Sequence, residues 1–180
     1  MEIITDLETL RRKSLPTSIE EMDATGFWAA AEETMDRLEH ACGVTANQLG
    51  HLKRAFIARI DVFKRMKFIN PVILERTELR PFKDEGCLSF PGKYIDTARH
   101  WKVRIKDDVN GEQEFTGFLA AVMEHEVDHL DGVLYMDRQS QPVRRKNVKV
   151  KPNEPCPCGR LKDSLSDRKV PVKYKHCCGK

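Results

Sequence analysis

The chain has 180 residues, of which 40% are hydrophobic and 33% are charged, and its formal net charge at pH 7 is +3. This length is sufficient for one compact domain with a buried core and a small appendage. No apolar run approaches the roughly 18 residues that a membrane span needs, and residues 1–6 lack the basic and apolar build of a signal peptide. We therefore expect a soluble protein of the cytoplasm, without a membrane span.

The charge is divided unevenly along the chain. Residues 141–180 carry 12 Lys and Arg against three Asp and Glu, a net charge of +9, which leaves 19 against 25 and a net charge of −6 for residues 1–140. A basic tail on a mildly acidic body can approach an anionic surface such as RNA, phosphate or an acidic protein face. The alternative is a solvated tail that only keeps the protein soluble.

The first regular element that the sequence predicts is a helix between Ser18 and about His40. Ser18 and Glu21 have the spacing of a capping box, and Gly26 is placed to interrupt the helix. Gly43 follows at a position where a left-handed residue would end it. The apolar residues that recur at helical spacing are Trp28, Ala31, Met35 and Leu38.

Short strands are predicted in the middle of the chain. Residues 52–74 are rich in Phe, Ile and Val with stretches of period two, interrupted by Asn70 and Pro71. Apolar and basic residues alternate over 101–106, and residues 109–112 (Val-Asn-Gly-Glu) are typical of a hairpin turn. This region therefore predicts antiparallel strands joined by short turns.

A second helix is predicted from a cap at Thr116 to about Asp131, where Gly132 ends it. Because this helix follows a set of hairpin-connected strands, we expect a fold of the α+β class. In that fold, antiparallel strands pack around one central helix.

The predicted organisation of the chain has three segments. Residues 1–140 form the α+β body, residues 141–153 form a basic linker, and residues 154–180 form a separate cysteine-bearing tail. Six cysteines would make a disulfide framework in a small secreted protein. In a chain that carries no export signal, we expect them to be metal ligands or reactive thiols.

The second predicted helix carries a candidate metal site. His125 and His129 lie at i and i+4, so both imidazoles project from one helical face toward a single divalent cation. Glu126 is turned too far round the helix to be a third ligand, but it can contact a water on the metal as a general base. The alternative is a surface helix with incidental histidines. The apolar residues Phe118, Ala121 and Val122, which share that face, favour a buried site.

A catalytic metal site needs a third protein ligand and an open fourth position. In one protease pattern a further histidine follows, but Tyr135 stands at that position, and tyrosine is a poor ligand at neutral pH. The best remaining ligand is Cys87, because Cys42 lies in a context typical of a small buried residue. Taken alone, Cys87 is more often a thiol of the core.

The three segments that contain these residues resemble the signature motifs of the peptide deformylase family. Residues 85–89 (Glu-Gly-Cys-Leu-Ser) and 125–129 (His-Glu-Val-Asp-His) match the family pattern completely, and residues 43–48 (Gly-Val-Thr-Ala-Asn-Gln) match it more loosely. The resemblance covers most of residues 1–140.

The departures from the family pattern all lie in or beside the first motif. Ala41 stands where the family usually has glycine, Thr45 where it has alanine, and Asn47 where it has proline. We expect these differences to narrow or reshape the substrate channel, and therefore to affect substrate preference more than the catalytic step.

The resemblance implies hydrolysis of the N-formyl group from formyl-methionyl nascent peptides. It makes Cys87, His125 and His129 the ligands of a ferrous ion (Fe²⁺). Ligand type alone would suggest Zn²⁺, and Zn²⁺ or Ni²⁺ remains an alternative for the catalytic site. An iron site with a thiolate ligand is expected to be prone to oxidation.

The resemblance also assigns roles to residues around the metal. Glu126 accepts a proton from the attacking water, while the side-chain amide of Gln48 and the backbone N–H of Leu88 face the negative charge that grows on the formyl oxygen. The residues expected to bind the methionine are Gly43, Val44 and Val122.

The tail concentrates four thiols and one imidazole within 23 residues, a density that predicts a closed structural Zn²⁺ site. The alternative is a set of thiols that form disulfides. The tail is similar to the SEC-C type zinc motif of the bacterial preprotein translocase ATPase, which implies a docking module for the ribosome or for translation and export factors. The expected ligands are Cys156, Cys158, Cys177 and Cys178, with His176 as the alternative fourth ligand.

Two other functions are weighed against the deformylase hypothesis. One is a related metallo-amidase that acts on another N-acyl peptide, which the altered first motif would suit. The other is a binding protein whose catalytic body no longer turns over. The presence of every expected catalytic group argues against this last alternative.

Overall fold

The computed structural model describes residues 2–139, 161–163 and 169–171. The chain divides into two compact units, Met1–Ser140 and Gln141–Lys180. In the second unit, β7 (Leu161–Asp163) pairs antiparallel with β8 (Lys169–Pro171). Within the described part of the chain, every helix is too short or too polar to span a membrane.

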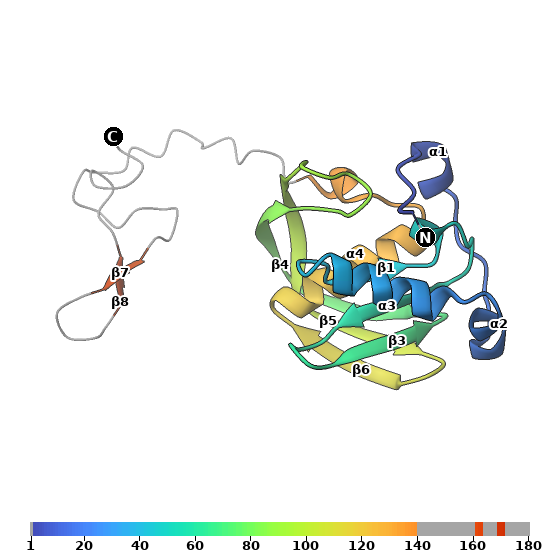
Figure 1. The fold of residues 1–180 in the computed structure, drawn as a ribbon. Helices are drawn as coiled ribbons and strands as arrows, with labels where there is room; N and C mark the ends of the chain where they lie inside the picture. The colour runs from blue at the N-terminus through green and yellow to red at the C-terminus, as the bar shows by residue number, and fades with distance from the viewer. Residues whose placement is uncertain (1, 140–160, 164–168, 172–180) are drawn as a thin grey trace. The chain divides into compact units, whose positions relative to one another are not determined.

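The first unit is a mixed fold of helices and antiparallel strands (Figure 1). One sheet has the order β1 (Gly43–Thr45), β2 (Ala55–Arg59) and β3 (Arg65–Ile69), and the other has the order β4 (Val72–Glu85), β5 (Ile95–Asp107) and β6 (Gly111–Thr116). All strand pairs in both sheets are antiparallel. The helices are α1 (Leu7–Leu10), α2 (Ile19–Ala24), α3 (Phe27–Arg37) and α4 (Phe118–Leu130), with short 3₁₀ turns at Asn47–Leu49 and Tyr135–Arg138.

The predicted N-terminal helix is divided into α2 and α3, and the break lies at Gly26, which has a φ of 71°. Ser18 caps α2 by accepting a hydrogen bond from the Glu21 backbone N–H. The prediction for Gly43 was wrong, because α3 ends at Arg37 and Gly43 is the first residue of β1. Its φ is not positive, so Gly43 does not end a helix.

The strands within residues 52–74 and the hairpin turn between β5 and β6 are confirmed. The length of β4 was not predicted from the sequence. It continues to Glu85, and most of its side chains are exposed or half-buried. Because backbone pairing with β5 along nearly its whole length holds this strand in place, its side chains do not show the alternation that burial of one face imposes.

The second predicted helix is confirmed as α4, with a different start. Thr116 is the last residue of β6, and Gly117 occupies the N-cap position with a φ of 63°. The predicted stop at Gly132 is confirmed, since its φ is 73°. A Cβ atom there would lie 2.3 Å from the backbone oxygen of Arg11, so close packing also requires glycine.

Helix α4 lies at the centre of the fold, and 10 of its 13 residues are buried. Val122, Met123 and Val127 pack in one cluster with side chains from β2, β3, β5 and β6. In this cluster the rings of Phe56 and Phe68 stack with their centroids 4.4 Å apart. Since α4 has no face left for solvent, its buried polar side chains need partners or a function.

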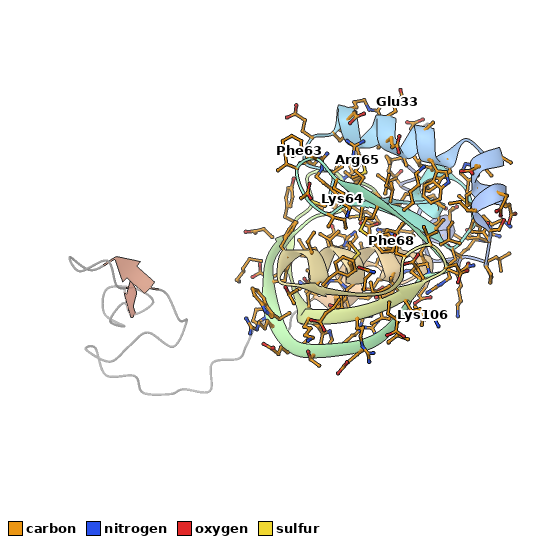
Figure 2. The ribbon with its side chains drawn as sticks, turned by 90° about the horizontal axis from the view of Figure 1, so that it is seen from below. Glu33, Phe63, Lys64, Arg65, Phe68 and Lys106 are labelled. Atoms are coloured by element: carbon orange, nitrogen blue, oxygen red, sulfur yellow. The ribbon has the colours of Figure 1, made fainter. Side chains whose placement is uncertain are left out.

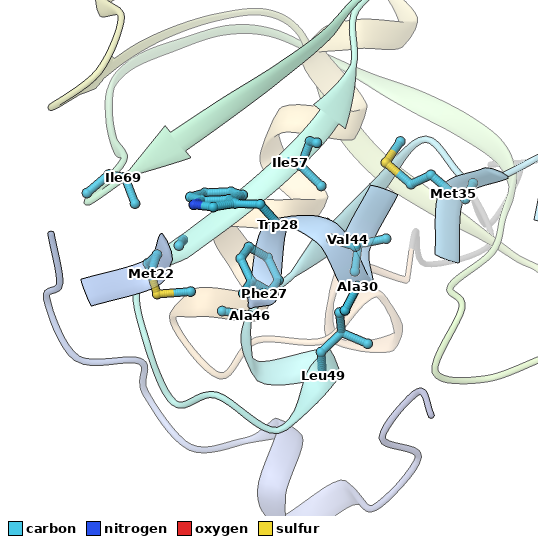
Figure 3. Close-up of a cluster of buried hydrophobic side chains, with 13 residues drawn as sticks. Met22, Phe27, Trp28, Ala30, Met35, Val44, Ala46, Leu49, Ile57 and Ile69 are labelled. Atoms are coloured by element: carbon cyan, nitrogen blue, oxygen red, sulfur yellow. The ribbon is translucent and has the colours of Figure 1, made fainter. Parts of the chain in front are cut away.

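A second cluster fixes the first sheet against α3. It includes Met22, Phe27 and Trp28 from the helices, together with Val44 and Ile57 from the strands (Figure 3). Elsewhere, Figure 2 shows Phe68 inside the protein and Phe63 at the β2–β3 turn, where its side chain is exposed. Val44 anchors β1 in this second cluster, and β1 contacts both α3 and α4.

Candidate metal centre

Three metal-binding side chains come together in the first unit, although they are far apart in the sequence. Cys87 lies in the loop after β4, and His125 and His129 lie one turn apart on α4. One ligand atom from each lies within 4.8 Å of the other two, and the Cys87 Sγ and His129 Nε2 atoms are 3.2 Å apart. One sulfur and two imidazole nitrogens fit a tetrahedral divalent cation with a fourth position left for water or substrate.

The ring of His125 is held by a neighbouring carboxylate. Its Nδ1 atom lies 2.6 Å from Glu85 Oε1, so its Nε2 atom is left for a cation. Burial alone would lower the pKa of His125, but Cys87 and Glu85 raise it well above the ordinary value. A positive charge is therefore favoured on the ring between this thiol and this carboxylate, and a metal ion would lie on the Nε2 side of the ring, toward Cys87 and His129.

Glu85 belongs to a buried network of charged groups. Arg99 donates to its two oxygens at 3.0 and 2.6 Å, and donates to Asp128 at 2.5 Å. Arg138 in turn binds both oxygens of Asp128. Burial would raise the pKa of Glu85, but hydrogen bonds from His125 and Arg99 lower it to about 2. Glu85 therefore stays ionised and can hold the ring of His125.

Glu126, like His129, is a buried polar side chain of α4 with an atom that lacks a hydrogen-bond partner among the described residues. Its Oε2 atom is buried without a hydrogen-bond partner among the residues that the structure describes. Burial is the main cause that raises the pKa of Glu126 to about 7, and the charges of His125 and Arg99 act in the opposite direction. A carboxylate with this pKa is suited to exchange a proton near neutral pH. A bound cation would lower this pKa.

Gly43 lies directly against Glu126. A Cβ atom at residue 43 would approach the Glu126 Oε1 atom to 2.4 Å and its Cδ atom to 2.6 Å. A side chain at residue 43 would therefore displace the Glu126 carboxylate from its position on α4. The glycine is therefore required for the close approach of β1 to Glu126, and not for a helix stop.

A cavity of about 600 Å³ opens beside these groups. Its walls include the predicted residues Gly43, Gln48, Leu88 and Val122, together with Cys87, His125 and Glu126. Val44 does not line this cavity, and the prediction that its side chain contacts substrate is corrected. The side chain of Val44 has no exposed surface and packs in the cluster between α3 and β2.

Cys42 lines the same cavity but is not part of the group of metal-binding side chains. Burial, and after it the charge of Glu126, raises the pKa of the Cys42 thiol. At neutral pH Cys42 is therefore a neutral thiol, which is a poor metal ligand. The position of Cys87 beside His125 and His129, which Cys42 does not share, separates the two cysteines of the first unit.

The side chain of Gln48 has one defined orientation. Its Oε1 atom accepts a hydrogen bond from the Thr45 backbone N–H at 3.0 Å, so its Nε2 atom points the other way. Nε2 lies 3.3 Å from Ser89 Oγ and 3.7 Å from Cys87 Sγ. The amide therefore presents a donor to the place where the metal-binding side chains meet.

The departures from the family pattern do not all face the cavity. Ala41 lines it, whereas Thr45 and Asn47 do not and are 0% and 1% exposed. The expectation that all three residues reshape the substrate channel is therefore corrected for Thr45 and Asn47. The predicted tail ligands Cys156, Cys158, Cys177 and Cys178, the alternative His176 and the linker 141–153 lie outside the described residues.

Comparison with known proteins identifies the family of this chain. Residues 2–145 match the family of polypeptide deformylases. Peptide deformylase 1 of Clostridium perfringens is 42% identical over 102 residues, which cover 54% of this chain and 69% of that protein. A peptide deformylase of Xylella fastidiosa is 34% identical over 150 residues, which cover 79% of this chain and 87% of that protein.

Solved structures give the same result for the fold. The peptide deformylase of Thermotoga maritima superposes with a TM-score of 0.68 at 32% identity, over 78% of this chain and 97% of that one. Peptide deformylase 1B of Arabidopsis thaliana superposes with a TM-score of 0.69 at 29% identity, over 79% and 83%. The fold, the converging cysteine and histidines and these matches together show that the chain belongs to the peptide deformylase family.

Proposed function

We propose that this chain is a metal-dependent hydrolase that removes the formyl group from the N-terminal methionine of newly synthesised proteins. Membership of the peptide deformylase family supports this activity. The observation that carries the proposal is the convergence of Cys87, His125 and His129 beside the unpaired Glu126, in a cavity large enough for a methionine side chain. Formyl-methionyl chains arise where proteins are made, so we place the enzyme in the cytoplasm.

The metal and the general base have separate roles in this proposal. A divalent cation held by Cys87, His125 and His129 supplies the Lewis acidity that activates water at neutral pH. Glu126 takes the proton of the attacking water and returns it to the departing amine. Its burial and its unpaired oxygen suit this transfer, because no other side chain competes for that oxygen among the described residues. We propose Fe²⁺ as the ion, with Zn²⁺ or Ni²⁺ as alternatives.

Two hydrogen-bond donors are proposed to stabilise the reaction. The Gln48 side-chain amide points toward Cys87, and Leu88 lines the cavity beside it. The amide of Gln48 and the backbone N–H of Leu88 would face the negative charge that grows on the formyl oxygen. Removal of one such donor typically lowers the rate by about a hundredfold to a thousandfold. Gly43 and Val122 would contact the methionine.

The proposed reaction is tested by the choice of acyl group. We expect iron-loaded protein, prepared without oxygen, to cleave a formyl-methionyl tripeptide and to leave the acetyl-methionyl tripeptide intact at the same concentration. Released amine is the measured quantity. Cleavage of the acetyl peptide alone would contradict the proposal and favour a metallo-amidase. Cleavage of neither peptide by metal-loaded protein would favour a binding protein without turnover.

For the tail, we propose a structural Zn²⁺ site within residues 154–180, joined to the catalytic domain 1–140 by the basic linker 141–153. The ligands would be Cys156, Cys158, Cys177 and Cys178, with His176 as the alternative. The density of thiols in so short a segment supports this, because metal binding would supply most of its folding free energy. Docking to the ribosome or to export factors would raise the local concentration of substrate.

The zinc proposal predicts two metal ions per chain. Intact mass under non-denaturing conditions should show one zinc in addition to the catalytic metal, and this zinc should be absent from a chain truncated after residue 141. Equal metal content in the two proteins would contradict a zinc site in the tail. The truncated chain should keep its activity toward a short formylated peptide, because the described ligand set lies within residues 87–129.

A further inference from the structure

Two polar residues of the first motif, Thr45 and Asn47, are buried beside the catalytic cavity without lining it. The family usually has alanine and proline at these positions, which offer no side-chain hydrogen bond. Burial of a hydroxyl and an amide is unfavourable unless both are hydrogen-bonded. The partners of these two side chains therefore indicate what their presence achieves.

Asn47 connects the first motif to the end of α4. Its Nδ2 atom donates to the backbone oxygen of His129 at 2.8 Å. That oxygen lies in the last turn of α4 and also accepts from the Gly132 backbone N–H at 3.2 Å. Because Nδ2 must face this oxygen, Oδ1 faces the opposite way and accepts from Thr45 Oγ1 at 2.7 Å. The residue that carries a metal-binding ring is thus tied directly to the motif.

Thr45 also contacts Gln48, at two points. Its backbone N–H and its hydroxyl oxygen both lie 3.0 Å from Gln48 Oε1. On the other side of the amide, one N–H of Gln48 is taken by Ser89 Oγ at 3.3 Å. With Oε1 and one N–H occupied, the remaining N–H points toward Cys87 Sγ, 3.7 Å from Nε2, where both residues line the cavity. A half-turn of this amide would present an oxygen to the negative charge of the reaction and remove the stabilisation.

We propose that Thr45 and Asn47 are positioning residues for formyl hydrolysis, which fix the amide of Gln48 relative to the helix that carries His125 and His129. This inference rests on the proposed function. The three side chains are linked, because the single hydroxyl proton of Thr45 is shared between Asn47 Oδ1 at 2.7 Å and Gln48 Oε1 at 3.0 Å, and Asn47 Nδ2 donates to the His129 oxygen. In this proposal, Thr45 and Asn47 act on the catalytic step and not on the shape of the channel, whereas Ala41 lines the cavity.

The Thr45→Val variant tests the proposal, since it keeps the shape of the side chain and removes the hydroxyl. We expect kcat for a formyl-methionyl tripeptide to fall about tenfold, with KM within about twofold, because the lost bond acts on the donor to the transition state. Thr45→Ser should restore kcat. The matched control is Thr34→Val, which removes an equally buried hydroxyl that binds the Ala30 backbone oxygen in α3. It should lower thermal stability and leave kcat unchanged.

A double-mutant cycle separates positioning from a general loss of stability. If Thr45 acts through Gln48, the Thr45→Val substitution should have little further effect on kcat once Gln48 has been replaced by Ala. An equal tenfold loss in both backgrounds would overturn the inference. Unchanged kcat in Thr45→Val would overturn it as well.

Hydrogen exchange of the Asn47 side chain does not depend on catalysis, so it tests the inference separately from the proposed function. The Asn47 side-chain amide should exchange its protons slowly in the wild type, because it is buried and donates to His129. Thr45→Val should accelerate this exchange at least about tenfold, since the amide loses its only side-chain donor. Unchanged exchange would overturn the inference even if the wild type cleaves no formyl peptide, whereas an inactive wild type with accelerated exchange would count against the proposed function alone.

Discussion

Glu126→Gln is expected to lower kcat for a formyl-methionyl peptide by at least about a hundredfold while the protein still binds its metal. Glutamine has the same shape as glutamate but cannot accept a proton, and Glu126 lies on the cavity beside the metal-binding side chains. Metal content measured in the same sample excludes loss of the ion as the cause. Full activity in this variant would show that another group is the general base.

The stability of this variant provides a second check. Burial raises the pKa of Glu126 from 4.5 to about 7 in the metal-free protein. A carboxyl group whose pKa is raised on folding destabilises the folded state as the pH rises through this interval, because the ionised form is disfavoured there. Metal-free Glu126→Gln should therefore melt at pH 8 no lower than the metal-free wild type. A large fall in melting temperature would contradict this electrostatic account.

Glu124 provides the matched control for these measurements. It is equally buried on α4, but it does not line the cavity, and its carboxylate accepts from Arg76 Nε at 3.0 Å and from the His100 backbone N–H at 2.7 Å. Glu124→Gln should therefore keep kcat near the wild-type value and lower the melting temperature. The two buried carboxylates lie two positions apart on α4, and their substitutions are expected to have opposite effects on kcat and on melting temperature.

Cys87→Ala is expected to abolish activity through loss of the catalytic metal. Substitution of residues that only support metal ligands already lowers affinity about 10- to 100-fold, and Cys87 supplies a ligand atom itself. Iron per chain, measured after anaerobic loading and gel filtration, should fall close to zero. The zinc expected in the tail does not interfere with this measurement, because only iron is counted.

Cys42→Ala is the control for Cys87→Ala, since Cys42 lines the same cavity with a neutral thiol. Its iron content should match that of the wild type. If Cys87→Ala retained a full complement of iron, or if Cys42→Ala lost it, the assignment of the third ligand would be wrong.

The histidine ligands were predictable because their geometry is local. A spacing of four residues on a helix fixes the two rings on one face, and the apolar pattern around them fixed the helix. Cys87 was different, because it is separated from His125 by the complete hairpin of β5 and β6. Taken alone, a cysteine in this position is more often a thiol of the core. The resemblance to a known family was the reason to predict that Cys87 binds the metal.

The contacts around the metal-binding side chains could not be predicted from the sequence. The bond between Glu85 and His125 depends on how β4 meets α4, and no local pattern encodes it. In β1 all three residues are buried, so no alternation indicated that Gly43 lines the cavity while Val44 packs in the core. The hydrogen bonds of Thr45 and Asn47 likewise require knowledge of which residues approach them.

The most direct test of this account is the location of iron in crystals grown without oxygen, by anomalous scattering at the iron edge. We predict a single catalytic peak bonded to the Cys87 thiolate and to the Nε2 atoms of His125 and His129, at distances close to the roughly 2.0–2.3 Å of zinc sites. An iron atom bound elsewhere, or a residue 87 sulfur outside bonding distance of it, would contradict the proposed enzyme.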